Sequence, residues 1–132
     1  MEKEWILYCT GVVPAISSIV RKMTEIGDDI VVLAPVYNIF YNSILNNGRK
    51  VLASELRYAD GSYTIDYADL EEKLSRETTS LFIFCNPHNP IGKVWDRPTL
   101  ELIAELCIKH DVLVVSDEIR CDLTHIGHAY IP

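Results

Sequence analysis

The 132-residue sequence has no cluster of lysine and arginine, and its net charge is −7. Nucleic acids attract basic surfaces, so we expect no nucleic-acid partner. The apolar runs are far shorter than the roughly 20 residues of a membrane-spanning helix, so we expect a soluble protein without a membrane contact. The first ten residues, MEKEWILYCT, lack the apolar core and cleavage site of a signal peptide.

The sequence also lacks internal repeats and paired cysteines. Its four cysteines form no CxxC motif and stand mostly in apolar runs, which is typical of small core residues in a reduced, cytoplasmic protein. With 48% apolar residues, the chain can build one core. The charged start and the ending Tyr130-Ile131-Pro132 favour a fragment of a longer chain, and an independently folding domain is the alternative.

Apolar patterns of strand and helix type alternate along the chain, which predicts an α/β fold with a mostly parallel sheet. Asp66 and Asp96 stand where helix N-caps are expected, and Asp60-Gly61 predicts a hairpin turn. In the last helix, an inward face is predicted for Leu100, Ile103, Ala104, Leu106 and Cys107. We expect strands at 5–9, 30–34, 50–54, 80–85 and 112–116, the last one buried, and helices at 12–26, 38–47, 66–75 and 96–110.

Polar side chains follow several of these strands directly. Tyr37 follows the strand at 30–34, the loop CNPHNPIG at 85–92 follows the next long strand, and Asp117 follows the last. A glycine turn, TGVV, leads into the first helix. Taken singly, each has an ordinary structural role, such as a turn or a helix cap. Because ligands bind at the carboxyl ends of parallel strands, the coincidence of all four at one edge favours a binding site.

The combination suits a flat, anionic, nitrogen-containing cofactor. A helix N-terminus binds phosphate, an aromatic ring stacks on a heteroaromatic one, and a buried carboxylate keeps a ring nitrogen protonated. An amide can donate to a phenolate oxygen. These are the requirements of pyridoxal phosphate.

Three stretches extend this interpretation to a family. NPHNPIGKVW, with SDEI about 25 residues later and PVYNIFYNSILNNGRKV upstream, resembles fold-type I pyridoxal-phosphate enzymes of the class I/II aminotransferase superfamily. Within that group the chain is most similar to the cystathionine β-lyase branch of carbon–sulfur lyases. The resemblance implies a three-layer fold in which residues 1–132 are part of the large, cofactor-binding domain. It also implies a homodimer that acts on a small amino-acid substrate, with the small domain and the cofactor-linked lysine outside this sequence.

The resemblance assigns roles residue by residue. It implies that Asn89 contacts the phenolic oxygen, Asp117 pairs with the pyridinium nitrogen, and Tyr37 stacks on the ring. Val12 and Val13 are implied to offer backbone N–H groups to the phosphate. Asn86, His88 and Gly92 are implied to shape the loop.

Two departures from the family pattern stand out. Three positions after Asp117, where relatives commonly carry tyrosine or histidine, this sequence has Arg120. Arginine cannot accept a hydrogen bond, although it can donate one to the phenolic oxygen. The catalytic lysine is implied about thirty residues beyond Asp117, and Lys93, which stands near the loop, is better explained as a solvated surface lysine.

Three other functions stay open at this point. An aminotransferase would use the same residues, so the choice of a lyase follows the branch resemblance alone. A non-enzymatic regulatory protein could keep the fold without the reaction. A metal site could use Cys121, His125 and His128, but their spacing is looser than that of zinc sites, so we expect no metal.

Overall fold

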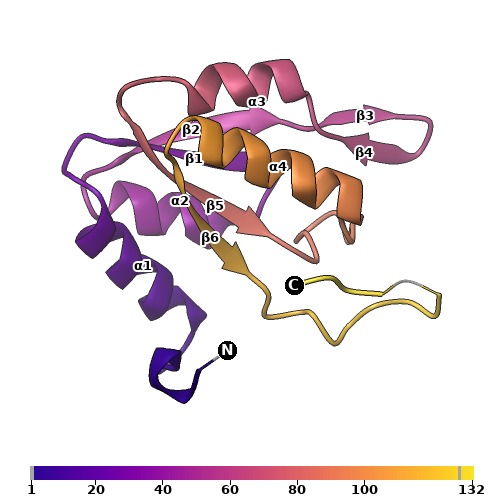
Figure 1. Cartoon of the computed structure of the whole chain (residues 1–132), viewed down its shortest axis with the longest axis horizontal. Coiled ribbons are helices and arrows are strands. Elements are labelled where there is room, and N and C mark those ends of the chain that lie inside the picture. The colour runs from indigo at the N-terminus through magenta and orange to yellow at the C-terminus, as the bar shows by residue number, and fades with distance from the viewer. Residues whose placement is uncertain (1, 128) are drawn as a thin grey trace.

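The protein folds as alternating helices and strands in a computed structural model, which describes residues 2–127 and 129–132 (Figure 1). The order of elements confirms the alternation predicted from the apolar patterns. The helices are η1 Lys3–Trp5, a 3₁₀ turn, and α1 Val12–Met23, α2 Asn38–Leu45, α3 Tyr67–Leu74 and α4 Arg97–Lys109. The strands are β1 Asp29–Ala34, β2 Lys50–Glu55, β3 Arg57–Ala59, β4 Ser62–Thr64, β5 Thr79–Cys85 and β6 Leu113–Asp117.

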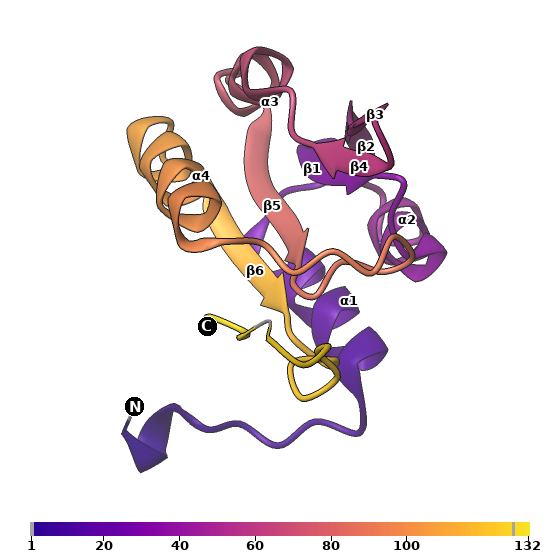
Figure 2. The same cartoon turned by 90° about the vertical axis from the view of Figure 1, so that its right-hand side faces the viewer.

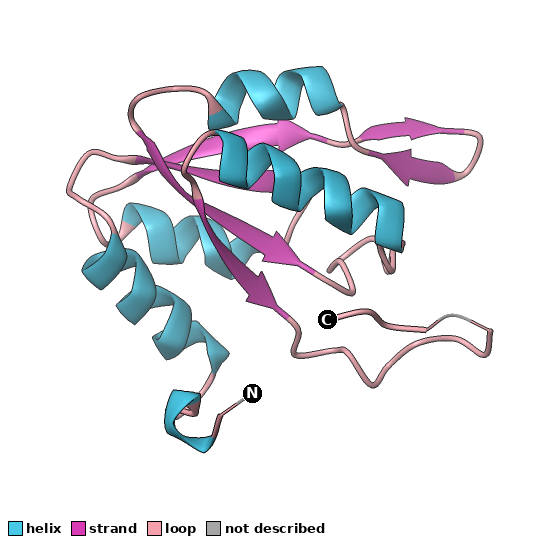
Figure 3. Ribbon diagram, viewed as in Figure 1, coloured by secondary structure: helices cyan, strands magenta, loops and turns pink. Residues whose placement is uncertain are grey.

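Four of the strands form one parallel sheet in the order β2-β1-β5-β6. The chain runs from β1 outward to β2 and then crosses back to β5, so the direction of strand addition reverses beside β1. Such a reversal opens a crevice at the carboxyl ends of the strands, where ligands bind in folds of this kind. Strands β3 and β4 form a separate antiparallel hairpin beyond the sheet (Figure 3).

The sheet is the middle of three layers, as predicted. Alternate residues of the buried strands enter two separate cores, because successive side chains of a strand point to opposite faces. Ile30 and Val32 pack with α1 and α2, whereas Val31 and Leu33 pack with α3 and α4. Figure 2 shows the two helix pairs on opposite faces of the sheet.

Local signals for turns and caps agree with the structure. The Asp66 carboxylate accepts a hydrogen bond from the Asp69 N–H at 3.3 Å, and the Asp96 carboxylate accepts one from the Thr99 N–H at 3.1 Å. Each therefore satisfies a free donor at a helix start. Gly61, with φ of 76°, and Asp60 lie at the tip of the predicted hairpin.

Five expectations from the sequence were wrong. Residues 5–9 form no strand, because no strand among the described residues pairs with them and their side chains are exposed. Helices α1 and α2 end early, α1 at Met23 and α2 at Leu45. Strand β6 is largely exposed because it is the edge strand of the sheet, and Ala104 is exposed because α4 packs mainly through Ile103, Leu106 and Cys107. No helix within the described ranges has the length and apolarity to cross a membrane.

Candidate cofactor site at the strand ends

A pocket of about 330 Å³ lies where β1, β5 and β6 end and α1 begins. We call it the strand-end pocket. It brings together residues that are up to 109 positions apart in the sequence, Gly11 and Arg120, because the parallel strands all end at this edge. The six candidate cofactor residues predicted from the sequence all line it: Val12, Val13, Tyr37, Asn89, Asp117 and Arg120.

Asp117 is the last residue of β6 and lies beside Cys85, the last residue of β5. The residue is only 7% exposed, and its Oδ1 accepts a hydrogen bond from the Ile119 N–H at 3.2 Å. Burial raises the pKa of this carboxyl, although the Ile119 N–H and the Arg120 charge oppose the shift. A carboxylate in this position gains stability from a cationic partner inside the pocket.

Helix α1 presents its N-terminus to the same pocket. Gly11, the N-cap residue, has no side chain to accept from the first turn, and the first turn contains no acidic residue. The N–H groups of Val12 and Val13 precede the first hydrogen bonds of the helix, so they remain available as donors. Together with the helix dipole, they favour an anionic group at this wall of the pocket.

Tyr37 covers another wall of the strand-end pocket. It caps α2 just after β1, and its ring meets Phe40 edge to face at a centroid distance of 6.0 Å. With 38% of its surface exposed, the ring is available for stacking on a flat ligand.

Six residues that line the pocket were not among the predicted cofactor residues, namely Gly11, Pro14, Ile16, Phe40, Cys85 and Ile119. Burial raises the pKa of the Cys85 thiol to about 11, so the thiol is neutral at physiological pH and donates to the Pro87 carbonyl at 3.3 Å. The signal for Cys85 was its position at the end of a strand, directly before the loop. Its apolar surroundings led to the interpretation as a core residue, which is also what it is.

The loop at 86–92 is held from several sides, which agrees with its predicted scaffolding role. The Asn86 N–H donates to the Asp117 carbonyl at 3.1 Å, and its Oδ1 accepts from the Trp95 N–H at 3.2 Å. Gly92, with φ of 70°, donates its N–H to the His88 carbonyl at 2.8 Å and closes the turn. Asn89 is thereby fixed at the rim of the strand-end pocket.

His88 connects this loop to the segment that carries Tyr37. It is 1% exposed, its Nε2 lies 3.0 Å from the Pro35 carbonyl, and its ring meets Trp95 edge to face. A carbonyl only accepts, so Nε2 carries the proton and Nδ1 is the bare nitrogen of a neutral ring. Within the described residues, Nδ1 has no hydrogen-bond partner. His88 is therefore scaffolding rather than an exposed base, as predicted.

Acidification is expected to destabilise the protein through His88. Burial lowers the pKa of His88 below its ordinary value of 6.5. Below pH 6.5, His88 binds a proton in the unfolded chain but stays neutral in the folded protein. The free energy of unfolding therefore falls with pH until the pH reaches the pKa of His88 in the folded protein. His88→Gln keeps a donor for Pro35 but cannot titrate. Urea unfolding above and below pH 6.5 should therefore show that acidification lowers the free energy of unfolding less in this variant than in the wild type. If acidification lowers the free energy of unfolding equally in the two proteins, His88 is not the cause, since the other histidines are common to both.

None of the lysines within the described residues lines the strand-end pocket. Lys93 lies near the loop, but its Nζ donates to the Tyr63 carbonyl at 2.6 Å. No three His, Cys, Asp or Glu side chains of the described part of the chain come together as metal ligands. His128, the third member of the alternative metal site, lies outside the described residues.

The strand-end pocket fits pyridoxal phosphate in three respects. A buried carboxylate with a raised pKa suits a protonated ring nitrogen, an uncapped helix N-terminus suits a phosphate, and an exposed aromatic face suits the ring. Asn89 and Arg120 add two donors on the side of the pocket that faces the loop.

Comparisons with known proteins agree with this geometry. Residues 1–124 match the family "aminotransferase class I and II". The chain is 50% identical over 129 residues to cystathionine beta-lyase PatB of Bacillus subtilis, which covers 98% of this chain and 33% of the relative. It is 33% identical over 132 residues to protein MalY of Escherichia coli, covering 100% of this chain and 34% of the relative.

A solved structure shows the same fold. Cystalysin from Treponema denticola, whose crystal structure contains pyridoxal 5'-phosphate, superposes with a TM-score of 0.98 at 38% identity, covering 100% of this chain and 34% of cystalysin. The chain thus spans about a third of the length of the relatives that it matches. The family match over residues 1–124 and the strand-end geometry lead to one conclusion: the chain belongs to the class I and II aminotransferase family.

Proposed function

We propose that residues 1–132 work as part of the large, cofactor-binding domain of a longer pyridoxal-phosphate enzyme. The strand-end pocket carries every predicted cofactor residue but, among the described residues, no lysine to link the cofactor. In this proposal the lysine and the small domain belong to other parts of the polypeptide. The chain's coverage of about a third of its relatives supports it.

In this proposal, different residues of the chain bind different parts of the cofactor. Val12 and Val13 bind the phosphate through their N–H groups, and Tyr37 stacks on the ring. Asp117 holds a proton on the ring nitrogen by charge pairing. Asn89 donates its amide to the phenolic oxygen. Arg120 donates there as well, at the position where the family resemblance implies a tyrosine or histidine.

When bound, pyridoxal phosphate supplies an electron-accepting ring that stabilises negative charge at the substrate α-carbon. The chain's part is to keep that ring protonated through Asp117 and oriented between Tyr37 and Asn89. Proton removal from the α-carbon requires a general base, and the neutral, buried His88 is unsuited to it. We assign that step to the lysine outside this sequence.

The reaction that we propose is β-elimination from cystathionine or a related cysteine-type amino acid. The Cβ–S bond breaks, sulfur takes the electron pair and leaves as a thiol, and water then releases pyruvate and ammonia. The observation that carries this choice is the 50% identity to cystathionine beta-lyase PatB over 98% of the chain. By the same family argument the full-length protein is a cytoplasmic homodimer.

An aminotransferase is the second candidate. The chain is 30% identical over 136 residues to kynurenine–oxoglutarate transaminase 3 of Mus musculus. The residues of the strand-end pocket serve both reactions, because each begins with charge at the α-carbon. A regulatory protein on the same fold is the third candidate, and a full-length sequence without a lysine beyond Asp117 would favour it.

The full-length protein is expected to bind pyridoxal phosphate and to release pyruvate from L-cystathionine. Purified protein mixed with the cofactor should gain a visible absorption band that survives gel filtration, because the cofactor is held covalently. Pyruvate, ammonia and thiol should then appear in equal amounts. A protein that shows the band but forms pyruvate only when a 2-oxo acid accepts the amino group of alanine is an aminotransferase. A protein without the band is not a pyridoxal-phosphate enzyme.

A further inference from the structure

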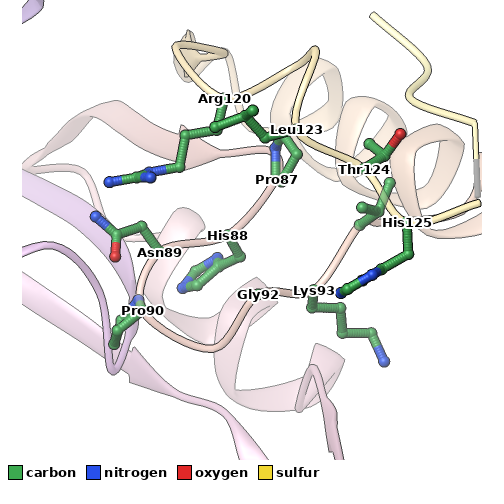
Figure 4. A pocket seen from close by; sticks show the side chains of 11 residues that line it. Pro87, His88, Asn89, Pro90, Gly92, Lys93, Arg120, Leu123, Thr124 and His125 are labelled. Carbon is green, nitrogen blue, oxygen red and sulfur yellow. The ribbon is translucent and has the colours of Figure 1, made fainter.

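Asn89 lies on a short turn, residues 89–92, which we call the Asn89 turn. The residues on either side of the turn, His88 and Lys93, form an isolated antiparallel bridge. The His88 N–H donates to the Lys93 carbonyl at 2.7 Å, and the Gly92 N–H donates to the His88 carbonyl at 2.8 Å. Figure 4 shows Asn89 and Lys93 at opposite ends of the turn. A displacement of the Lys93 end therefore moves the end that carries Asn89.

Lys93 connects this turn to the β3–β4 hairpin. Its Nζ donates to the Tyr63 carbonyl at 2.6 Å and to the Ser62 hydroxyl at 3.4 Å, and both acceptors belong to β4. The same Nζ lies 5.3 Å from the centroid of the buried Trp95 ring, which attracts a cation. Lys93 is half-buried and, within the described ranges, forms no ion pair. Its charge is thus used inside the protein and not in solvent, as its place in the sequence suggested.

The hairpin is a firm support because both of its ends enter the core. Leu56 precedes β3 and Ile65 follows β4, and these residues are 8% and 7% exposed. The Leu56 N–H donates at 2.7 Å to the carbonyl of Ala34, the last residue of β1. Tyr63 of the hairpin and Ile91 of the Asn89 turn pack against the same core cluster. Lys93 therefore joins the turn to a part of the structure that is fixed on the sheet.

We propose that Lys93 is a positioning residue for Asn89. It ties one end of the Asn89 turn to β4, while the other end is held by the His88 Nε2, which lies 3.0 Å from the Pro35 carbonyl. Two anchored ends fix the place of the Asn89 amide at the rim of the strand-end pocket, and Lys93 itself does not line that pocket. Such a support matters because a misplacement of about 1 Å can cost roughly 100-fold in rate. The inference rests on the proposed function only in naming the phenolic oxygen as the group that Asn89 meets.

The first measurement needs no cofactor. Lys93→Met removes the donor and keeps a side chain of similar length over Trp95. By hydrogen–deuterium exchange and mass spectrometry on the full-length protein, the peptide covering 86–95 should exchange about tenfold faster in this variant, because the loop opens more often without the hydrogen bonds of a charged donor. Lys93→Arg retains a charged donor and should restore the wild-type rate. Lys50→Met is the matched control, since Lys50 is exposed and, among the described residues, forms no ion pair.

The second measurement follows the pH dependence of the cofactor's visible band in the full-length protein. A donor beside the phenolic oxygen favours loss of the cofactor's proton, because it stabilises the negative charge left on that oxygen. Asn89→Ala should therefore move the midpoint of the band to higher pH. Lys93→Met should move it in the same direction by a smaller amount, and Lys93→Arg should not move it. A purely structural loss would reduce the amount of folded protein and leave the midpoint in place.

Two results would overturn the inference. One is equal exchange of the 86–95 peptide in Lys93→Met and Lys50→Met, and the other is faster exchange in Lys93→Met with an unchanged midpoint of the band. If Lys93→Met fails to fold, Lys93→Gln, which stays polar but is shorter and uncharged, takes its place in both measurements. A wild type without a visible band refutes the proposed function, whereas the exchange experiment still decides whether Lys93 holds the turn.

Discussion

Asp117→Ala is expected to lower the rate of pyruvate release by the full-length protein by at least about 100-fold, the usual effect of losing a preorganised electrostatic partner. Among the described residues, Asp117 is the only acid that lines the strand-end pocket, so nothing there can replace its charge. Without that charge, the ring nitrogen loses its proton more readily and the ring accepts electrons less well. The measurement is the initial rate at saturating cofactor.

Two further variants separate the charge of Asp117 from its packing. Asp117→Asn keeps the size and can still accept from the Ile119 N–H, so it should fold normally and lose nearly as much activity. Burial raises the pKa of Asp117, which means that its charge does not stabilise the folded protein without a partner. Glu118→Gln is the matched control next to it, because Glu118 lies outside the strand-end pocket. Near-normal turnover by Asp117→Asn would refute the assignment.

The sequence could predict the site because strand ends are local features. The runs IVVLA and LFIFC are buried on both faces, and each ends at a residue pattern that stops a strand. Parallel pairing then places Tyr37, Asn89 and Asp117 at one edge, whatever their separation in the chain. The family, inferred from NPHNPIGKVW and SDEI, is confirmed. The individual roles of the six candidate residues stay predictions.

The exposure of β6 and the lack of a strand at 5–9 could not be predicted from the sequence, because both depend on which strands lie alongside. VLVVS has the composition of a buried strand, but β6 lies at the edge of the sheet and Leu113 is 42% exposed. Residues 5–9 are as apolar as a strand, yet no strand in the described part of the chain pairs with them. Whether a strand lies in the centre or at the edge of the sheet depends on the whole fold, so the local apolar pattern cannot predict it.

The end of α1 depends on a distant residue in the same way. Apolar spacing extends the helix to Ile26, whereas the structure ends it at Met23. Thr24 leaves the helical conformation, and its hydroxyl donates to the Val20 carbonyl at 2.6 Å. Arg49, which is 25 positions from Thr24, donates hydrogen bonds to the carbonyls of Arg21 and Thr24 at the end of the helix. In the sequence, Arg49 is only a charge beside the Asn47-Gly48 turn.

Arg49→Met is expected to lower the free energy of unfolding by roughly 3 kcal/mol, because each buried acceptor left without a donor costs about 1–3 kcal/mol. Arg49 is 7% exposed, and its guanidinium donates to the carbonyls of Arg21, Thr24 and Asn47. Its Nε also donates to the Thr24 hydroxyl at 2.8 Å. Methionine fills much of the same space but offers no donor. Urea unfolding of the purified protein, followed by circular dichroism, measures the difference.

Arg97→Met is the matched control for this change, since Arg97 is 67% exposed and its contact with Glu101 is 3.8 Å long. Exposed pairs of this kind contribute about 0–1 kcal/mol, so the control should remain close to the wild type. Arg49→Lys should fall between the two, because an ammonium has three donors and cannot reach all the acceptors of a planar guanidinium. Equal stabilities of Arg49→Met and Arg97→Met would contradict a stabilising role for the hydrogen bonds of Arg49. A confirmed loss would mean that the helix whose first residues line the strand-end pocket is anchored at its opposite end by Arg49.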